Sequence, residues 1–505
     1  MTDSTDKRGW GLIALVLALS AAHFATFFDP DHSIVGDLRY FIYFAWRISE
    51  GAIPHLDLFD NKTFLASYTG ALLHRLGDGL GLDPLATIRA GYLGLCALGG
   101  PLAFLVFRRL GGRDSVVGLL GFFAYLSFGF VGALAAVGNV PKLIMALCAP
   151  AMALLVQDRR WLAAGFLGAV AFLDWQVGLL VWAAAFAGAL VHGAPRSRAC
   201  IRVVLGGALG VAPLAAWYAL NGALRIAFDQ TFAAAWSRAV AHFGDASESS
   251  PLQRILEQVN QSCTEHEWLF FTGLLGLAIL PYCLWIWRGT DTQRLLLPLG
   301  IYHYGVVGFS LVDFQRYGDF FLLLHSVAFL LGLVWFTLYA AAKRWSGGRL
   351  QIVVPAVILS LAFAAARPGP LRPEVVVFAP YNALPGVTLS DQKRVAEEVR
   401  ERTQAGTFVL IGNSELLFLM HQVNPLPVIY WNAAAYSYYG DVVNEDRSEA
   451  AMRLLLSVEP DAFVWTQRAP MPQRLRESFA RHRLGSGRDG YQVTLMVRRP
   501  APALP

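Results

Sequence analysis

Charged residues are scarce in this chain of 505 residues. Asp, Glu, Lys and Arg make up 15% of it, whereas hydrophobic residues make up 55% and the mean hydropathy is +0.46. Soluble domains carry about 25% charged residues, so this composition excludes a soluble protein and predicts a polytopic α-helical membrane protein. The net charge of +5 is modest and the basic residues are spread over short loops, which indicates membrane topology and argues against a nucleic-acid partner.

Cysteine is scarce as well, and its spacing fits neither disulfide pairs nor a metal site. The five cysteines are Cys96, Cys148, Cys200, Cys263 and Cys283. Four of them lie in or beside apolar segments, where a thiol packs as a small apolar group, and we expect no structural disulfide. A small-residue cleavage site is also missing after the first apolar run, so this run is expected to remain as the first transmembrane helix.

Long apolar runs, by contrast, are frequent. A helix needs about 20 mostly apolar residues to cross the bilayer, and a charge at its centre costs about 2.5–3.5 kcal/mol, so charges mark the loops. This rule predicts eleven spans, at 9–28, 85–107, 115–135, 140–157, 160–174, 176–193, 200–220, 267–287, 294–312, 319–341 and 350–366.

Lys and Arg residues gather in the loops on one side of these spans. That side holds Lys7, Arg8, Arg108, Arg109, Arg113, Arg159, Arg160, Arg196, Arg198, Arg202, Arg288, Arg294, Lys343, Arg344 and Arg349. The positive-inside rule assigns it to the cytoplasm, together with the N-terminus, and assigns the C-terminal end to the opposite side. We therefore expect a multi-pass protein of the cell inner (plasma) membrane whose C-terminal domain is extracytoplasmic, in the periplasm.

The chain is expected to form two domains, a transmembrane domain at 1–366 and a small extracytoplasmic α/β domain at 367–505. In the second, β-rich runs such as "TFVLIG", "AFVWT" and "YQVTLMVRR" alternate with helical patterns such as "SDQKRVAEEVRERTQ" and "RSEAAMRLLLS". The first domain has two long extracytoplasmic loops, 29–84 and 221–266. In the latter, apolar residues recur every four positions from Phe228, which predicts an amphipathic helix lying in the membrane interface.

The first loop concentrates polar residues at the membrane surface. Its stretch "GDLRYFIYFAWRISEG" places Asp37 at a helix start, where a carboxylate is favoured, and ends at Gly51. A turn bounded by proline follows and carries Asp57, Asp60 and Lys62 before a second apolar segment. We therefore expect two interfacial helices with acids and a lysine between them.

This loop resembles the first extracytoplasmic loop of GT-C membrane glycosyltransferases. The shared features are an Asp after the first span, a helix ending in Gly, the run G-x-x-P-x-x-D-x-x-D-x-K and an apolar L-x-x-Y segment. Within that class it is most similar to the polyprenyl- or dolichyl-phosphate-sugar-dependent family of protein O-mannosyltransferases, lipid A aminoarabinose transferases and rhizobial core glycosyltransferases. The chain departs from the family where Lys62, Thr63 and Phe64 replace the usual Lys-Pro-Pro.

The resemblance implies transfer of a sugar from a lipid phosphate to a hydroxyl acceptor with inversion, on the extracytoplasmic face. Asp37 resembles the catalytic Asp of the family and would be the general base, a role worth about 10²–10⁴-fold in rate; a plain helix cap is its alternative. Asp57 and Asp60 would orient substrate, hold a divalent cation, or stabilise turns. Two carboxylates are a weak metal signal, so no metal ligand is assigned. Lys62 would pair with the lipid phosphate or be a solvated loop lysine.

Other polar residues at the same face are candidates for binding the donor head group. Arg316 and Tyr317 resemble an R-Y pair at the start of a family helix, and Arg suits forked phosphate recognition. Lys142 opens the fourth span, and Asp174 lies between two short spans, where an ionisable group is commonly functional. The alternative is that all four are boundary or loop residues.

Other classes of membrane protein remain as alternatives. A transporter or flippase should show internal repeats with broken helices and charges near the midplane, and no such repeat is found in the sequence. An O-antigen ligase or polymerase would carry its large loop late in the chain. The absence of the two prolines after Lys62 leaves one more alternative, a catalytically inactive relative that acts as a scaffold. The acceptor would be a glycan, a lipid such as lipid A, or a protein; the sequence does not distinguish them.

Overall fold

The chain folds into two compact units, each assembled from separate stretches of sequence. The helical unit comprises Met1–Phe28, Arg89–Leu214 and Ser247–Val376, and the mixed unit comprises Asp29–Ile88, Ala215–Ala246 and Val377–Pro505. The computed structural model describes residues 3–128, 140–234, 250–262, 267–312, 314, 317–345, 353, 355–358, 360, 387–403, 406–410, 412–429, 435, 438–439, 447–464, 477–485 and 493–499. The mixed unit thus draws on both long loops and on the C-terminal region expected from the sequence.

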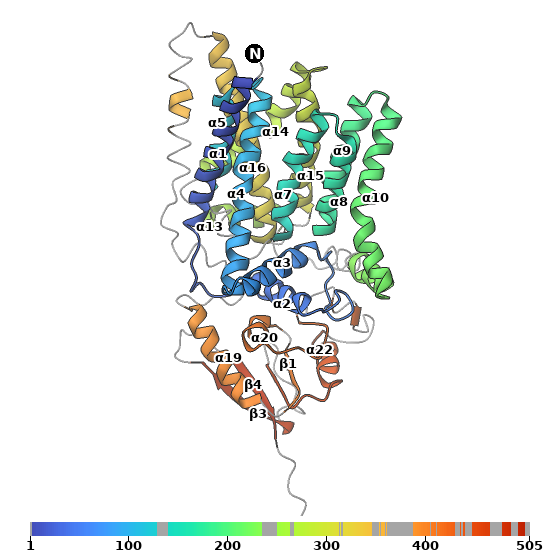
Figure 1. Cartoon of the computed structure of the whole chain (residues 1–505). Helices are drawn as coiled ribbons and strands as arrows, with labels where there is room; N and C mark the ends of the chain where they lie inside the picture. Colours follow the sequence, from blue (N-terminus) through green and yellow to red (C-terminus); the bar gives the residue numbers. More distant parts are fainter. Residues whose placement is uncertain are drawn as a thin grey trace, which may run out of the picture. The chain divides into compact units, whose positions relative to one another are not determined.

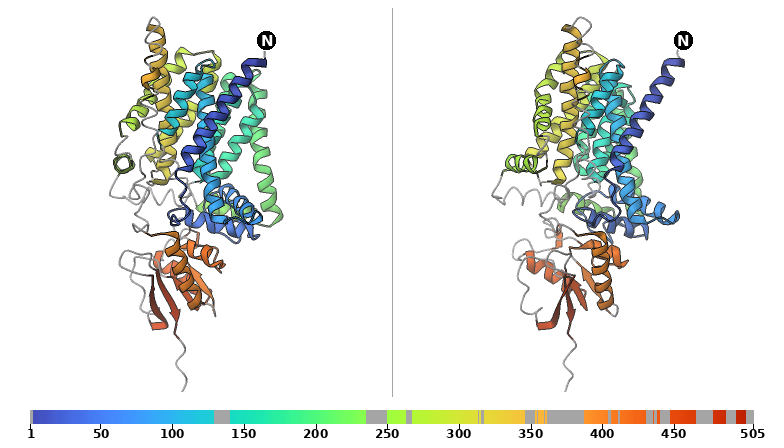
Figure 2. Two further views of the ribbon diagram at one scale, coloured as in Figure 1. Left: turned by 60° about the vertical axis from the view of Figure 1, so that its left-hand side comes forward. Right: turned by 90° about the vertical axis from the view of Figure 1, so that its left-hand side faces the viewer.

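The helical unit is built mostly from apolar helices, with the polar, amphipathic α13 among them (Figures 1 and 2). They are α1 (Asp3–Ala25), α4 (Pro84–Leu110), α5 (Ser115–Leu126), α7 (Val140–Gln157), α8 (Trp161–Asp174), the 3₁₀ turn η1 (Gln176–Gly178), α9 (Leu179–His192), α10 (Arg196–Leu220), α13 (Pro251–Ser262), α14 (Glu267–Ile286), α15 (Asp291–Val312) and α16 (Tyr317–Trp345). By length and composition α4, α10, α14, α15 and most of α16 suffice to cross a membrane. Each of the first ten predicted spans overlaps one helix of this unit. The eleventh, 350–366, lies almost wholly outside the described residues.

Small residues let these helices pack closely. A Cβ atom added at Gly165 of α8 would lie 2.1 Å from the carbonyl oxygen of Val203 in α10, and one added at Gly206 of α10 would lie 2.0 Å from that of Leu162. Glycine at such contacts is the usual way in which membrane helices approach one another, because lipid gives no hydrophobic drive to their association. A core of α7, α8, α9 and α15 side chains fills the space beside this contact.

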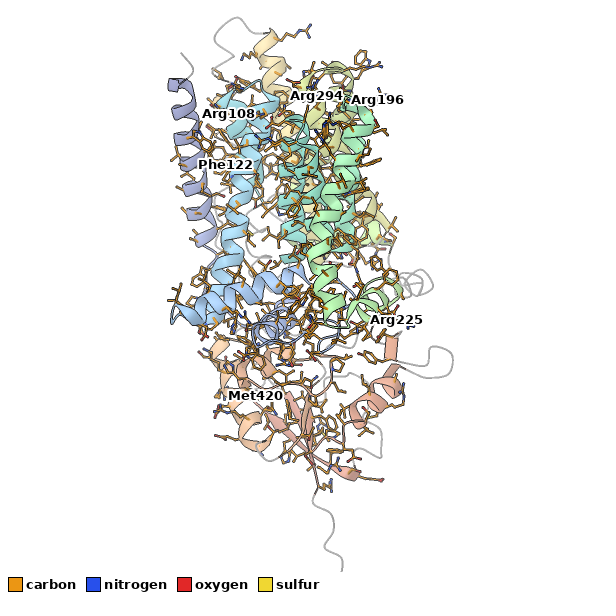
Figure 3. The ribbon with its side chains drawn as sticks, turned by 45° about the vertical axis from the view of Figure 1, so that its right-hand side comes forward. Arg108, Phe122, Arg196, Arg225, Arg294 and Met420 are labelled. Atoms are coloured by element: carbon orange, nitrogen blue, oxygen red, sulfur yellow. The ribbon has the colours of Figure 1, made fainter. Side chains whose placement is uncertain are left out.

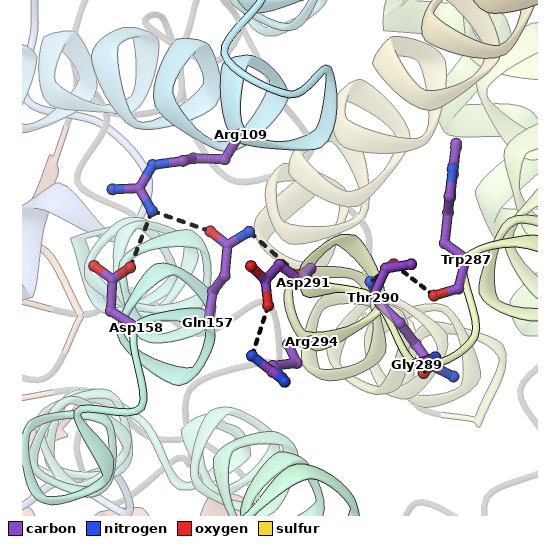
Figure 4. A network of polar contacts seen from close by, with 9 residues as sticks. Arg109, Gln157, Asp158, Trp287, Gly289, Thr290, Asp291 and Arg294 are labelled. Atoms are coloured by element: carbon purple, nitrogen blue, oxygen red, sulfur yellow. Dashed lines mark hydrogen bonds and ion pairs between the residues drawn. The ribbon is translucent and has the colours of Figure 1, made fainter.

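Polar side chains join several helix ends on one side of the helical unit (Figure 4). Arg109 at the end of α4 donates to Asp158 at 2.9 Å and to Gln157 at 3.4 Å, just past or at the end of α7. Gln157 in turn donates to the backbone oxygen of Asp291 at the start of α15. Figure 3 shows Arg108, Arg196 and Arg294 at this same end. These basic residues belong to the loops that the sequence assigns to the cytoplasm.

The mixed unit contains helices and one sheet. The elements are α2 (Leu38–Ser49), α3 (Leu65–Gly79), α11 (Leu224–Phe228), the π-helical turn η2 (Asp229–Ala234), α19 (Leu389–Thr403), β1 (Phe408–Leu410), α20 (Ser414–Met420), α22 (Arg447–Leu456), β2 (Ala462–Val464), β3 (Phe479–Leu484) and β4 (Val493–Arg498). The strand order is β1-β2-β4-β3, with β1 and β2 parallel and the other pairs antiparallel. Val409, Leu455, Phe463 and Met496 form the core beside the sheet.

The two helices of the first loop differ in burial. Helix α2, expected from the sequence to lie in the interface with one apolar stripe, is buried on nearly every side within the mixed unit. Helix α3 exposes Leu72 and Leu76 one turn apart, and α11 with η2 exposes Phe228 and Phe232, whose rings lie 4.9 Å apart. Such exposed apolar stripes suit a helix that lies at a membrane surface. The remainder of the amphipathic helix expected in the middle loop lies outside the described residues.

Candidate active site

Asp37 stands directly before α2, half-buried, in helical backbone geometry. Its side chain makes no capping hydrogen bond to the first turn of the helix, so the plain capping role that an Asp in this position commonly has is not used. Its carboxylate is close enough to Asp60 for the two charges to act on each other. The structure thus brings these two predicted site residues together.

Asp60, Lys62 and Tyr40 form a polar cluster beside Asp37. The backbone N–H of Lys62 donates to Asp60 Oδ1 at 3.2 Å, and Lys62 Nζ donates to the hydroxyl of Tyr40 in α2 at 3.1 Å. Burial raises the pKa of the Asp60 carboxyl; the Lys62 ammonium and backbone N–H groups oppose the rise, and the Asp37 carboxylate adds to it. Acids, a cation and a phenol therefore lie close together at the start of α2.

Asp57 serves the local turn. Its Oδ2 accepts the backbone N–H of Ile53 at 2.7 Å, and its own N–H donates to the carbonyl of the same residue. The side chain is exposed. This geometry matches the turn-stabilising alternative for Asp57, in which the carboxylate satisfies a backbone donor near its own position.

A buried histidine, His55, lies in the turn that precedes Asp60 and links it to Gln230 by hydrogen bonds. His55 has a left-handed backbone with φ of 70°, and its ring is sandwiched edge-on between Phe64 and Tyr218. Gln230 of η2 donates to the carbonyl of His55 at 3.1 Å and accepts from its Nδ1 at 2.8 Å, so the proton of the neutral ring is assigned to Nδ1. Burial lowers the pKa of His55 to about 4. Neither His55 nor Gln230 stands out in the sequence, since a lone His and a lone Gln carry no pattern.

Two further predicted residues lie in the helical unit, and both are buried. Lys142 Nζ donates to Asp319 Oδ1 of α16 at 2.9 Å and lies 5.0 Å from the ring centre of Trp175. Asp319 was missed in the sequence, although an acid in the first turn of a long apolar helix is a usable signal. Asp174 is fully buried where α8 ends, near Cys148 of α7. Lys142 is therefore neutralised within its own unit.

The last two predicted residues are described in part or not at all. Tyr317 begins α16, with nothing described of its side chain, and Arg316 lies outside the described residues. Among the residues that the structure describes, no group of three or more His, Cys, Asp or Glu side chains could hold a metal ion.

Apolar helices in one unit, and an acid-bearing loop folded with a small sheet in the other, define a polytopic helical membrane protein. The same fold is found in two crystal structures of ArnT from Cupriavidus metallidurans. The structure bound to undecaprenyl phosphate has a TM-score of 0.58 at 14% sequence identity, over 98% of this chain and 99% of that one. The apo structure has a TM-score of 0.59 at 14% identity, over 97% and 98%. The polytopic helical membrane fold of GT-C type expected from the sequence is thereby confirmed, whereas the number of spans and the C-terminal domain stay predictions.

By sequence, no protein-family model and no curated protein matches the chain. At 14% identity the structural likeness establishes the fold and leaves the reaction to be argued from the residues of the site.

Proposed function

We propose that the chain is an integral-membrane inverting glycosyltransferase that moves a sugar from a polyprenyl-phosphate donor to a hydroxyl acceptor on the extracytoplasmic face of the inner membrane. The observation that carries the proposal is Asp37, an acid at a helix start that makes no capping hydrogen bond and lies near a second, half-buried acid and a lysine. The match to an ArnT structure bound to undecaprenyl phosphate supports the lipid class of the donor.

In the proposed reaction the acceptor oxygen attacks the anomeric carbon of the sugar while the bond from that carbon to the phosphate oxygen breaks. Asp37 takes the proton of the attacking hydroxyl, and the polyprenyl phosphate leaves with the electron pair of the broken bond. Lys62, a compact cation held by Tyr40, would stabilise the charge on the leaving phosphate. Asp60 would hold Lys62 and the substrate in place.

The residues of the helical unit enter the proposal with separate roles. Arg316 and Tyr317 would contact the phosphate, and Asp174 would bind a polar group of the substrate. Lys142 is paired with Asp319, so its contribution to substrate binding would depend on that partner. The acceptor would be lipid A or core, another glycan or a protein.

The test uses purified full-length protein, labelled polyprenyl-phosphate sugars and membrane extract as the source of acceptors. Asp37→Asn should lower transfer about 10²–10⁴-fold while binding of undecaprenyl phosphate is retained, whereas Lys62→Met should weaken that binding. Asp78→Asn, at an exposed position of α3, is the matched control and should leave transfer unchanged.

Each alternative predicts a different result. Wild-type rates in Asp37→Asn would remove Asp37 as the base. If the wild-type protein transfers sugar from no donor and the Asp37→Asn strain keeps the wild-type cellular phenotype, the scaffold alternative is favoured. Movement of a labelled lipid-linked sugar across proteoliposome membranes without transfer would indicate a flippase.

A further inference from the structure

One face of α2 is held by the C-terminal part of the mixed unit. Arg39, Tyr43 and Trp46 follow one another at helical spacing, so they share a face of the helix. Arg39 Nε lies 3.6 Å from Glu415 Oε2, and Trp46 makes an edge-to-face contact with His421, with ring centres 5.6 Å apart. The other face carries Tyr40, which contacts Lys62.

Glu415 is an unusual residue in this position because it is fully buried. It lies in the first turn of α20, directly after the end of β1, and its Oε1 accepts the side-chain N–H of Asn413 at 3.2 Å. A carboxylate without solvent requires a cation or several donors. In open α/β sheets the region outside the carboxyl ends of parallel strands is where ligands bind; after β1 it receives the Arg39 side chain of the same chain.

A second tie fixes the next turn of α2 to the same segment. The backbone N–H of Asn424 donates to the Tyr43 hydroxyl at 3.0 Å. The Asn424 side chain in turn accepts from Leu410 N–H at 3.0 Å and donates to the carbonyls of Leu410 and Val428. Tyr43 is therefore anchored to the end of β1, close in sequence to the turn that carries Glu415.

We propose that Arg39 and Glu415 are positioning residues for the acid at position 37. Arg39 follows Asp37 by two positions in the first turn of α2, so the pair fixes the turn from which the Asp37 carboxylate projects. The C-terminal segment thereby sets the geometry of the base. This inference rests on the proposed function and adds to it a role for the C-terminal segment.

The experiment compares full-length wild-type protein with Glu415→Gln, which keeps the size of the side chain and removes its charge. Since a displacement of about 1 Å can cost about 10²-fold in rate, kcat should fall about 10–100-fold, while KM for the lipid donor stays near its wild-type value. Glu401→Gln, an exposed acid on α19, is the matched control and should behave as wild type.

A variant combination separates positioning from general damage. In an Asp37→Asn background there is no base left to position, so adding Glu415→Gln should not lower the residual rate further. A fall by the same factor in both backgrounds would show damage to the fold and overturn the proposal, as would a wild-type kcat in Glu415→Gln alone.

Removing the charge of one member of a buried ion pair weakens the compensation of the other, so Glu415→Gln is expected to be less stable than the wild type. The double variant Arg39→Met with Glu415→Gln buries no charge and should regain the thermal stability of the wild type, with kcat still lowered. Recovery of the wild-type kcat in the double variant would overturn the proposal.

Hydrogen exchange at the first turn of α2 should be faster in both variants. Unchanged exchange there counts against the contact whether or not the protein transfers sugar. A wild-type protein with no transfer but with faster exchange in the variants would refute the proposed function and leave the contact standing.

Discussion

Acidification is expected to destabilise the mixed unit through His55. The ring is buried, donates from Nδ1 to Gln230 and has a pKa lowered to about 4 by desolvation. In the unfolded chain the pKa returns to the ordinary 6.5. The folded state thus binds this proton less readily than the unfolded state, so the stability from His55 is complete above pH 6.5 and is lost as the pH falls toward 4.

The magnitude follows from the two pKa values. At pH 5 the unfolded imidazole is almost fully protonated and the folded one almost fully neutral, which corresponds to a loss of about 2 kcal/mol relative to pH 7.5. His55→Asn removes the titration, and Asn tolerates the left-handed backbone at this position better than most residues. The variant is expected to be less stable at pH 7.5 and less sensitive to acid.

The assay is thermal unfolding of the purified protein in detergent at pH 7.5 and pH 5.0, followed by tryptophan fluorescence. Because all other histidines titrate in both proteins, the difference between their two acid shifts isolates His55. An acid shift equal in wild type and His55→Asn would refute the reasoning, as would an NMR titration that places the imidazole of the folded protein near pH 6.5.

Two further predictions concern the helical unit. Lys142→Met should destabilise the protein by about 3–5 kcal/mol because it removes the ammonium group that lies 2.9 Å from the buried Asp319 carboxylate, and adding Asp319→Asn should recover much of the loss, measured as the yield of folded protein and its melting temperature; equal stability of all three proteins would contradict this. Gly165→Ala should force α8 and α10 apart and lower the yield of folded protein, since its Cβ would lie 2.1 Å from a backbone oxygen, whereas Gly308→Ala has open space and should be neutral. Equal yields for the two alanine variants would show that the close packing does not limit folding.

The sequence predicts the parts of this fold that are determined locally. Apolar length places the first ten predicted spans on helices of the structure, because the bilayer requires about 20 apolar residues in one stretch. The cluster of Asp37, Asp60 and Lys62 is also accessible from the sequence, since these residues are neighbours in one loop with a recognisable spacing. Their individual roles as substrate contacts stay predictions.

Contacts between distant stretches lie beyond such reasoning. Arg39 and Glu415 meet only because α2 packs against the turn after β1, and neither residue stands out from its neighbours in the sequence. Strand β3 was missed for a related reason, because Arg481 and Arg483 on its exposed positions interrupt the apolar pattern of an edge strand. The apolar residues of α2 predict a helix at the membrane surface, because the sequence pattern does not distinguish contact with lipid from contact with a distant segment of the same chain.

The mixed unit consists of three stretches that are far apart in the sequence, so the ribosome makes them at different times. Chains grow at about 5–20 residues per second, so the segment with Arg39 and Tyr43 precedes the one with Glu415 and Asn424 by tens of seconds or more. During that interval Arg39 and Tyr43 lack the contacts that Glu415 and Asn424 provide in the finished protein. A nascent chain interrupted before Glu415 would therefore expose the face of α2 that carries Arg39, Tyr43 and Trp46, which the finished protein covers.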